Sequence, residues 1–297
     1  MAGMLKFLII SLIMAELLHV QSYNMKGFNH SRDYIRNVIN LDNPDIICLQ
    51  ETWHIKEMHQ QFGNIHTDYT YVDEPGVDSN TKILSGRLYG GQAILYKKCI
   101  GDSVTKLDFK NNRLLGIHIK GRNGSNDIVV LTVYMPCDNR RAETVNVVFS
   151  DVLDDIEHIL SQYDDSGFII CGDWNTDPAR HNAQTNAFLE FLTRNNLNLC
   201  WNSPNAMSGG TYIDNIHGTA SCLDHFVLTE SVFESMHKCE IIECPTNPSD
   251  HHNVSFICNW DINSNIISEC SHVSKRTAWH RVNRDITAAS FLCRFTT

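Results

Sequence analysis

The segment Gly167–Asn175, GFIICGDWN, decides the fold. Its apolar run FIIC has the length and composition of a strand that is buried on both faces. Two polar residues, Asp173 and Asn175, follow this run almost at once. A buried strand that ends on a carboxylate is typical of layered α/β proteins, in which polar side chains gather where strands end.

Apolar runs of strand length recur along the chain and are separated by turn residues. They are LLHVQSYN, DIICLQ, GGQAILYK, LLGIHIK, DIVVLTVYMP, LNLCW, DHFVLTE, CEIIEC and NVSFICNW. Three segments have helical spacing instead: SRDYIRNVINL, with Asn29 or Ser31 as its cap, ETVNVVFSDVLDDIEHILSQY and NAFLEFLTRNN. Many strands with few helices predict a layered α/β sandwich of two packed sheets with helices outside.

Composition sets limits on the class of protein. The chain has 297 residues, of which 42% are hydrophobic and 20% charged, enough for one large domain or two small ones. The formal net charge of -10 argues against binding nucleic acid by charge alone. It does not exclude an enzyme whose carboxylates hold a cation against a phosphate.

Cysteine use and the N-terminus bear on localisation. Among the 11 cysteines, Cys48, Cys171 and Cys258 lie in apolar runs, which predicts free thiols in a reducing compartment. We therefore expect an intracellular protein, nuclear or cytoplasmic. The apolar stretch within residues 1–16 imitates a signal peptide, so secretion stays open as the alternative. It is too short to span a bilayer, and no stable membrane insertion is expected.

Three parts are expected along the chain: an N-terminal apolar extension over residues 1–16, a domain over 17–260 and a tail or linker over 261–297. The tail is polar and carries the basic cluster KRTAWHRVNR.

Polar residues stand at the ends of several predicted strands. They are Asn24, Glu51, Tyr134, Asp173, Asn175, Asp224 and the pair Asp250–His251. Any one of them alone is most simply a turn or capping residue. A whole set on separate strands favours a shared site, and oxygen ligands together with an Asp-oriented histidine suit metal-assisted hydrolysis of a phosphodiester.

Six short motifs carry a resemblance to a known family: SYN, LQET, VYMP, GDWN, SCLDH and SDHH, in this order. The series resembles the endonuclease/exonuclease/phosphatase superfamily, the fold of DNase I and of abasic-site endonucleases, over Leu17 to Trp260. The resemblance implies a four-layer α/β sandwich with two mostly antiparallel sheets. The stretch GGTYIDNIHGTASCLDHFVL is most similar to endonuclease domains of LINE-type (non-LTR) retrotransposons.

The resemblance implies a role for each strand-end residue. Glu51 would bind Mg²⁺, with Mn²⁺ as the alternative, and Asn24 and Asp250 would assist. Asp173 would position or deprotonate the attacking water. Asn175 would hold the phosphate or the histidine, and Tyr134 would contact the scissile phosphate. Asp224 would orient the histidine. His251 with Asp250 would act as acid/base or stabilise the phosphate.

Flanking residues receive weaker assignments. Thr211 would lie on a hairpin that approaches DNA, and Arg140 and Arg141 would meet the DNA backbone unless they are plain solvated surface. Trp53 is expected to pack beneath the site. Since successive side chains of a strand point to opposite faces, His252 is expected to face away from the site that holds His251.

The resulting hypothesis is a Mg²⁺-dependent endonuclease that nicks one DNA strand, as in retrotransposition, and leaves a 3′-hydroxyl. The partner would be DNA, without a small-molecule cofactor, and the chain would be a monomer taken from a longer polyprotein with a reverse transcriptase. Two alternatives remain open at this point: a phosphatase or sphingomyelinase-type phosphodiesterase of the same fold, and a decayed remnant that only binds DNA.

Overall fold

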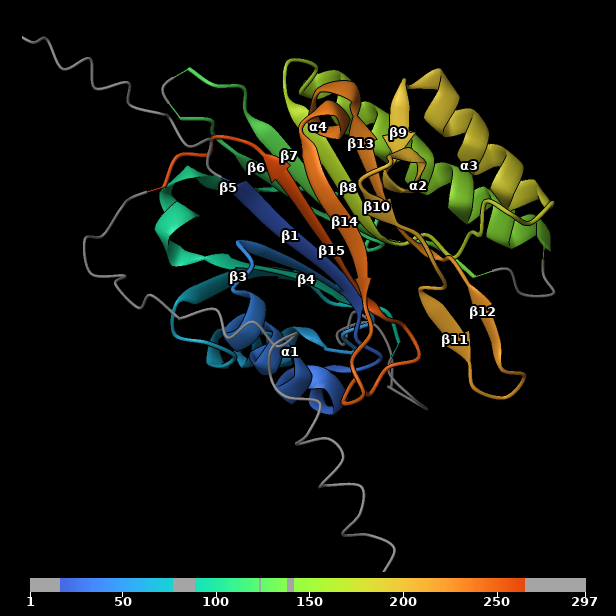
Figure 1. Cartoon of the computed structure of the whole chain (residues 1–297), viewed down its shortest axis with the longest axis horizontal. Helices are drawn as coiled ribbons and strands as arrows, with labels where there is room; N and C mark the ends of the chain where they lie inside the picture. The colour runs from blue at the N-terminus through green and yellow to red at the C-terminus, as the bar shows by residue number, and fades with distance from the viewer. Residues whose placement is uncertain (1–16, 77–88, 123, 138–141, 265–297) are drawn as a thin grey trace, which may run out of the picture. The chain divides into compact units, whose positions relative to one another are not determined.

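The computed structural model describes residues 17–76, 89–122, 124–137 and 142–264. These residues lie within one compact unit built on two large sheets (Figure 1). The predicted N-terminal extension over 1–16, the tail beyond 264 and both Arg140 and Arg141 lie outside the described residues.

The first sheet has seven strands in the order β10-β14-β15-β1-β2-β4-β3. Its strands are β1 (Leu17–Asn24), β2 (Ile46–Gln50), β3 (Tyr69–Glu74), β4 (Gln92–Lys97), β10 (Ala206–Met207), β14 (Met236–Ile242) and β15 (Asn253–Asn259). The β1–β2 and β10–β14 pairs are parallel and the other pairs antiparallel.

The second sheet has six strands in the order β5-β6-β7-β8-β13-β9. They are β5 (Val104–Leu107), β6 (Leu114–Ile119), β7 (Ile128–Tyr134), β8 (Gly167–Asp173), β9 (Leu197–Leu199) and β13 (Asp224–Thr229). Only β7 and β8 pair in parallel. A separate hairpin of β11 (Tyr212–Asp214) and β12 (Thr219–Ser221) projects from the body (Figure 1).

Helices cover the outer faces of both sheets. The apolar face of α1 (Phe28–Asp42) packs on the first sheet, and α2 (Ala142–Gln162) and α3 (Ala183–Arg194) cover the second (Figure 1). The short helices are α4 (Glu230–Glu234), η1 (Lys56–Asn64), η2 (Lys98–Ser103) and η3 (Cys200–Asn202). The arrangement helix, sheet, sheet, helix confirms the predicted four-layer α/β sandwich, with mixed sheets.

Apolar side chains from both sheets meet in the middle of the sandwich. Phe226 of β13 stacks on Phe256 of β15 with ring centroids 5.1 Å apart, which joins the two sheets directly. Cys48, Cys171 and Cys258 are buried and free, as expected from their apolar runs. Close packing of this kind is the main favourable term that holds such layers together.

A polar bridge also crosses the interior near the ends of β2 and β7. The Gln50 amide donates to Thr132 Oγ1 at 2.8 Å and to Ser22 Oγ at 3.2 Å, and Thr132 in turn donates to Gln92 Oε1 at 3.2 Å. All four residues are buried. Buried hydrogen bonds of this kind restrict the ways in which two sheets can pack, and this bridge links β2 and β4 of the first sheet to β7 of the second.

The structure corrects three local expectations. Helix α1 begins at Phe28 with Gly27 as its N-cap, and the expected cap Ser31 instead donates from Oγ to the Met25 carbonyl inside the protein. Strand β15 begins at Asn253, so the two histidines precede the strand. Packing also continues past Trp260, because Ile262 is buried and bridges to Gly121.

None of the helices in the described ranges combines the length and apolar composition that a bilayer crossing requires.

Candidate active site

The pairing of strands brings the predicted residues to one rim. On the second sheet Tyr134 is the register partner of Asp173, which in turn faces Asp224 on the antiparallel β13. On the first sheet Asn24 ends β1 beside the end of β2, directly before Glu51. Ends of neighbouring strands are only about 5 Å apart, so these side chains share one cleft edge.

Gly172 allows the close approach that places Asp173. Its φ is +143°, and a Cβ at this position would lie 2.1 Å from the carbonyl oxygen of Val133. Only glycine fits such a contact without displacing the neighbouring strand. The glycine of the GDWN motif therefore serves the geometry of β7 and β8 beneath the carboxylate.

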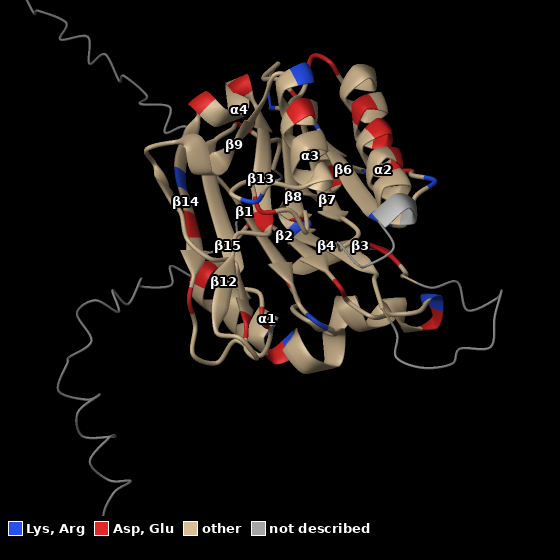
Figure 2. Ribbon diagram, turned by 90° about the vertical axis from the view of Figure 1, so that its right-hand side faces the viewer, with Lys and Arg blue, Asp and Glu red and all other residues tan. Residues whose placement is uncertain are grey.

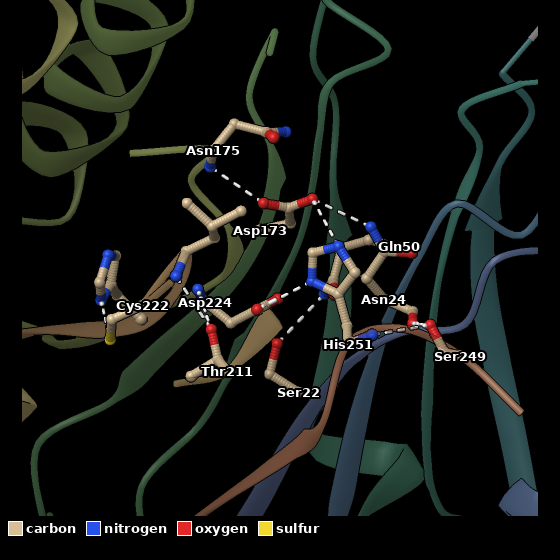
Figure 3. Close-up of polar contacts among 12 residues, drawn as sticks. Ser22, Asn24, Gln50, Asp173, Asn175, Thr211, Cys222, Asp224, Ser249 and His251 are labelled. Atoms are coloured by element: carbon tan, nitrogen blue, oxygen red, sulfur yellow. Dashed lines mark hydrogen bonds and ion pairs between the residues drawn. The ribbon is translucent and has the colours of Figure 1, made fainter. Parts of the chain in front are cut away.

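A buried cluster of two carboxylates and one imidazole forms the centre of the site (Figure 3). His251 Nδ1 lies 2.9 Å from Asp224 Oδ2, and His251 Nε2 lies 3.9 Å from Asp173 Oδ2. The exposed fractions are 1% for each aspartate and 6% for the histidine. Asp224 thus holds the imidazole with its other nitrogen directed at Asp173.

Proton affinities in the cluster depart strongly from ordinary values. Burial alone would lower the pKa of His251, but the charges of Asp224 and Asp173 outweigh it and raise this pKa to about 10. Burial raises the pKa of Asp173 to about 7, opposed by His251 and reinforced by Asp224. Near neutral pH the histidine is therefore a cation, while Asp173 changes its charge easily.

Asn24 links the centre to Glu51. Its amide nitrogen donates to Asp173 Oδ2 at 2.9 Å and to Glu51 Oε1 at 3.2 Å, while its oxygen accepts from the Lys26 backbone at 3.2 Å. Because the amide nitrogen points at the carboxylates, Asn24 orients them, and its expected role as a cation ligand stays a prediction.

Tyr134 stands next to the same carboxylates. Burial raises the pKa of its hydroxyl, and the neighbouring charges of Glu51 and Asp173 raise it further. Arg113 lies over the ring at 5.3 Å from its centroid and donates to the Tyr134 carbonyl at 3.0 Å. Tyr134 is consequently a neutral hydrogen-bond donor at the edge of the cluster.

Asn175 is held by its own backbone turn. Its backbone N–H donates to Asp173 Oδ1 at 2.9 Å (Figure 3). Its φ is +48°, and its side-chain amide donates to the Met135 carbonyl at 2.8 Å. Both bonds fix the segment after β8, and the first one positions Asp173 directly.

Asp250 does not accompany the histidine as expected. It forms an ion pair with Lys26, whereas the histidine bonds to Asp224. The cause is local geometry: the backbone of His251 bridges to Tyr212, outside any strand, and its ring turns inward to β13. The partner of the imidazole is thus Asp224, the residue to which the resemblance assigned this orientation, and the expected part of Asp250 as a cation ligand stays a prediction.

Thr211 is also placed differently. It precedes the β11–β12 hairpin, but its side chain is 0% exposed and cannot touch DNA. Its hydroxyl oxygen accepts from the backbone N–H groups of Leu223 and Asp224, both at 2.9 Å (Figure 3). Thr211 therefore fixes the backbone that carries Asp224.

Replacing Thr211 by valine should destabilise the protein by roughly 2 kcal/mol or more, because two buried N–H groups lose their acceptor. Thr211→Ser keeps the hydroxyl oxygen and should lose much less. Urea unfolding of the two variants checks this difference. Equal stabilities would show that the hydroxyl is not needed by these N–H groups.

The sequence indicated only weakly that three further residues lie beside the site. Lys26 lies next to Asn24 but belongs to no strand pattern, and Tyr212, whose ring centroid is 4.9 Å from that of His251, follows a glycine-rich turn. Trp53 was expected to pack beneath the site, yet its indole N–H donates to Glu51 Oε2 at 3.0 Å. The only available signal was adjacency to the motifs.

The donors present fit a hard divalent cation. Carboxylate oxygens of Asp173 and Asp224 lie within 4.8 Å of one another, and Asp224 Oδ1 is buried without a hydrogen-bond partner among the described residues. The Asn24 amide joins Asp173 to the carboxylate of Glu51. Burial raises the pKa of Asp173, and the neighbouring charge of Asp224 adds to this effect. Since His251 is protonated, oxygen atoms are the suitable ligands, as Mg²⁺ and Mn²⁺ prefer.

Comparison with known proteins agrees with this geometry. The endonuclease/exonuclease/phosphatase family matches residues 22–251, which include every member of the cluster. The chain belongs to this family. The predicted membership, made from six motifs, is thereby confirmed.

Solved structures of the family share the fold. An AP endonuclease from Leishmania major superposes with a TM-score of 0.68 at 16% identity, covering 82% of this chain and 88% of the other. A 3′ phosphatase from Neisseria, bound to product DNA hairpin, gives 0.62 at 16% identity and covers 82% and 100%. The endonuclease domain of TRAS1, a telomere-specific non-LTR retrotransposon, gives 0.60 at 13% identity and covers 82% and 99%.

Proposed function

We propose that the chain is a divalent-metal-dependent DNA endonuclease that nicks one strand and leaves a 3′-hydroxyl. The observation that carries the proposal is the buried arrangement Asp224–His251–Asp173, joined through Asn24 to Glu51. It combines the protonated imidazole of His251, the Asp173 carboxylate, whose charge changes near neutral pH, and carboxylate oxygens suited to a divalent metal ion.

Each side chain has a chemical task in this proposal. The anionic form of Asp173 accepts a proton from the attacking water, and its raised pKa makes it a base suited to neutral pH. His251, kept cationic by Asp224, donates hydrogen bonds to a phosphate oxygen and stabilises the charge that develops there. Tyr134 adds a neutral O–H donor beside it.

A divalent cation held by Glu51 and the neighbouring carboxylates would neutralise the phosphate and stabilise the leaving oxygen. The protein side chains supply the positions: Asn24 fixes two of the carboxylates relative to one another. The affinity for phosphate then comes from this site, which is consistent with an overall charge of -10.

The charge distribution favours this rim as the DNA-binding side. Acidic residues lie along α2, including exposed Asp151 and Asp154, and colour that helix red in Figure 2. A polyanion avoids such a surface. Lys26 and Arg113, in contrast, lie beside the cluster.

The proposal is tested with supercoiled plasmid. The whole chain should convert it to the nicked circle with Mg²⁺ or Mn²⁺, stop when EDTA is added, and leave ends that a polymerase can extend. Inositol phosphate and sphingomyelin are assayed in parallel. Turnover of either of these without plasmid nicking would favour the alternative phosphodiesterases, and DNA binding without cleavage under any metal would favour a decayed remnant.

The rate of nicking should depend on pH through Asp173. The carboxylate is active when deprotonated, so the rate should rise about tenfold per pH unit below about pH 7 and level off above it. A higher Mg²⁺ concentration should shift the rising part of the pH–rate profile to lower pH, because nearby positive charge favours the deprotonated form of the carboxyl group. Single-turnover nicking from pH 5.5 to 9 at two metal concentrations checks both, and a rate that falls across this range would contradict the assignment.

The retrotransposon origin is part of the proposal. The likeness to the TRAS1 endonuclease domain supports it, together with the tail motif KRTAWHRVNRD. The partner would then be DNA during element insertion, with a reverse transcriptase in the same polyprotein. Free thiols at all described cysteines and the burial of Asn253, which bonds to Gln21 at 2.7 Å and cannot accept a glycan in the folded state, support an intracellular site of action.

A further inference from the structure

Two residues of the Glu51–Trp53 turn have unusual backbone conformations. The φ angles of Glu51 and Trp53 are +49° and +52°, in the left-handed region that bulky residues rarely adopt. Such conformations persist where surrounding contacts impose them, and they concentrate at functional sites. The contacts around the turn show which interactions accompany this conformation.

Backbone bonds and one glycine hold the turn in place. The N–H groups of Thr52 and Trp53 donate to the carbonyls of Gly91 and Gly90 at 3.1 and 2.9 Å, and Gly27 N–H donates to the Glu51 carbonyl at 2.7 Å. A Cβ at Gly27 would lie 2.4 Å from Cε3 of Trp53. The indole ring therefore lies against a backbone that only glycine provides.

Packing alone does not account for this position of the ring. Trp53 is only half-buried and lines a cavity of about 300 Å³ together with Phe28, His30 and Met58. A tryptophan kept for burial would be expected to fill such a space, because protein interiors are close-packed. The conformation instead directs the indole N–H inward.

The contact that the turn does make is with Glu51. The indole N–H donates to Oε2 at 3.0 Å, while the Asn24 amide donates to Oε1 at 3.2 Å. Each oxygen thus accepts from one of these two donors, and the Tyr134 hydroxyl also interacts with the same carboxylate. The carboxylate cannot rotate without losing both bonds.

We propose that Trp53 is a positioning residue that sets the orientation of the Glu51 carboxylate for a divalent cation. The inference rests on the proposed function, since it assigns Glu51 to the cation. Donors that fix a ligand carboxylate typically contribute 10- to 100-fold in metal affinity. The strained turn is then the structural requirement for aiming the indole N–H.

The test is Trp53→Phe, which keeps an aromatic ring and removes the N–H. Calorimetric titration of the whole chain with Mg²⁺ should show about 10- to 100-fold weaker binding. Plasmid nicking should fall at limiting Mg²⁺ and recover when Mg²⁺ saturates. Trp260→Phe is the matched control, because that indole donates to the Asn126 carbonyl at 3.1 Å, outside the site.

Further variants separate the possible results. In a Glu51→Gln background Trp53→Phe should add no further loss, because the carboxylate it orients is gone. Unchanged Mg²⁺ affinity in Trp53→Phe, with a wild-type protein that binds Mg²⁺ and nicks, would overturn the positioning role alone. A wild-type protein that neither binds Mg²⁺ nor nicks would overturn the proposed function itself.

A folding defect in Trp53→Phe would not end the test. Benzothienylalanine placed at position 53 keeps the shape of the indole and replaces its N–H by sulfur. Weaker Mg²⁺ binding by this folded variant supports the role, and wild-type affinity excludes it.

Discussion

His251→Ala should abolish plasmid nicking, with a fall in rate of roughly 10²- to 10⁴-fold. The His251 imidazole lies between the buried carboxylates of Asp173 and Asp224, and alanine removes both its charge and the Nε2–H donor that the proposed function assigns to the phosphate. Single-turnover nicking at saturating Mg²⁺ measures the loss, at a temperature where circular dichroism shows that the variant is folded.

The neighbouring residue supplies the control. The backbone N–H of His252 donates to the Thr211 carbonyl at 2.7 Å, a bond that alanine retains, and Nδ1 of its side chain has no hydrogen-bond partner among the residues that the structure describes. His252→Ala should therefore nick within a few-fold of the wild-type rate. Equal loss in both variants would mean that the two histidines act through folding and would remove the assignment of His251.

Asp173→Asn should also lower the nicking rate by roughly 10²- to 10⁴-fold, because the amide cannot accept a proton from water. The same change should raise thermal stability at pH 8. The folded pKa of this carboxyl, about 7, lies above its ordinary value of 3.8, so stability falls as pH rises between these values, and the loss is complete at pH 8. The uncharged asparagine side chain does not undergo this loss of stability.

Asp173→Asn should lower the nicking rate and raise thermal stability, whereas misfolding would lower both. Asp165→Asn, an equal change of charge at an exposed turn before β8, should alter neither property. A less stable, inactive Asp173→Asn protein would point to a structural role for the carboxylate. Full activity would place the general base elsewhere.

Much of the fold could be predicted because strand signals are local. Continuous apolar runs such as those that end at Asp173 and Asn24 form β8 and β1 with bounds close to those expected. The hairpin strands β11 and β12 and the bridge from Gly121 to Ile262 could not be predicted, since they are short and depend on pairing between distant segments.

In the candidate site, too, some features could be predicted from local sequence and others depend on tertiary structure. Motif residues Asp173, Asp224 and His251 do lie together, and Asn24 joins Asp173 to Glu51, because these residues stand at or near the ends of strands. Adjacency in the chain favours Asp250 as the partner of the histidine, whereas the family resemblance assigned this role to Asp224. Asp250 is its neighbour in the chain, but the partner is the residue that tertiary structure brings to 2.9 Å.

The role of Thr211 was missed for a related reason. A hydroxyl near a hairpin is compatible with a surface contact, and only the folded backbone shows the two N–H groups that it satisfies. Side chains that support others leave no pattern of their own in a single sequence.

The site is assembled across the sandwich, and this has a consequence for the folding chain. Asn24 and Glu51 follow strands of the first sheet, whereas Asp173 and Asp224 belong to the second. Neither sheet alone carries both the proposed carboxylate base, Asp173, and the glutamate proposed to hold the cation, Glu51. Under the proposed function, a chain still emerging during synthesis, or one whose sheets have separated, would therefore not cut DNA until the two layers have packed on one another.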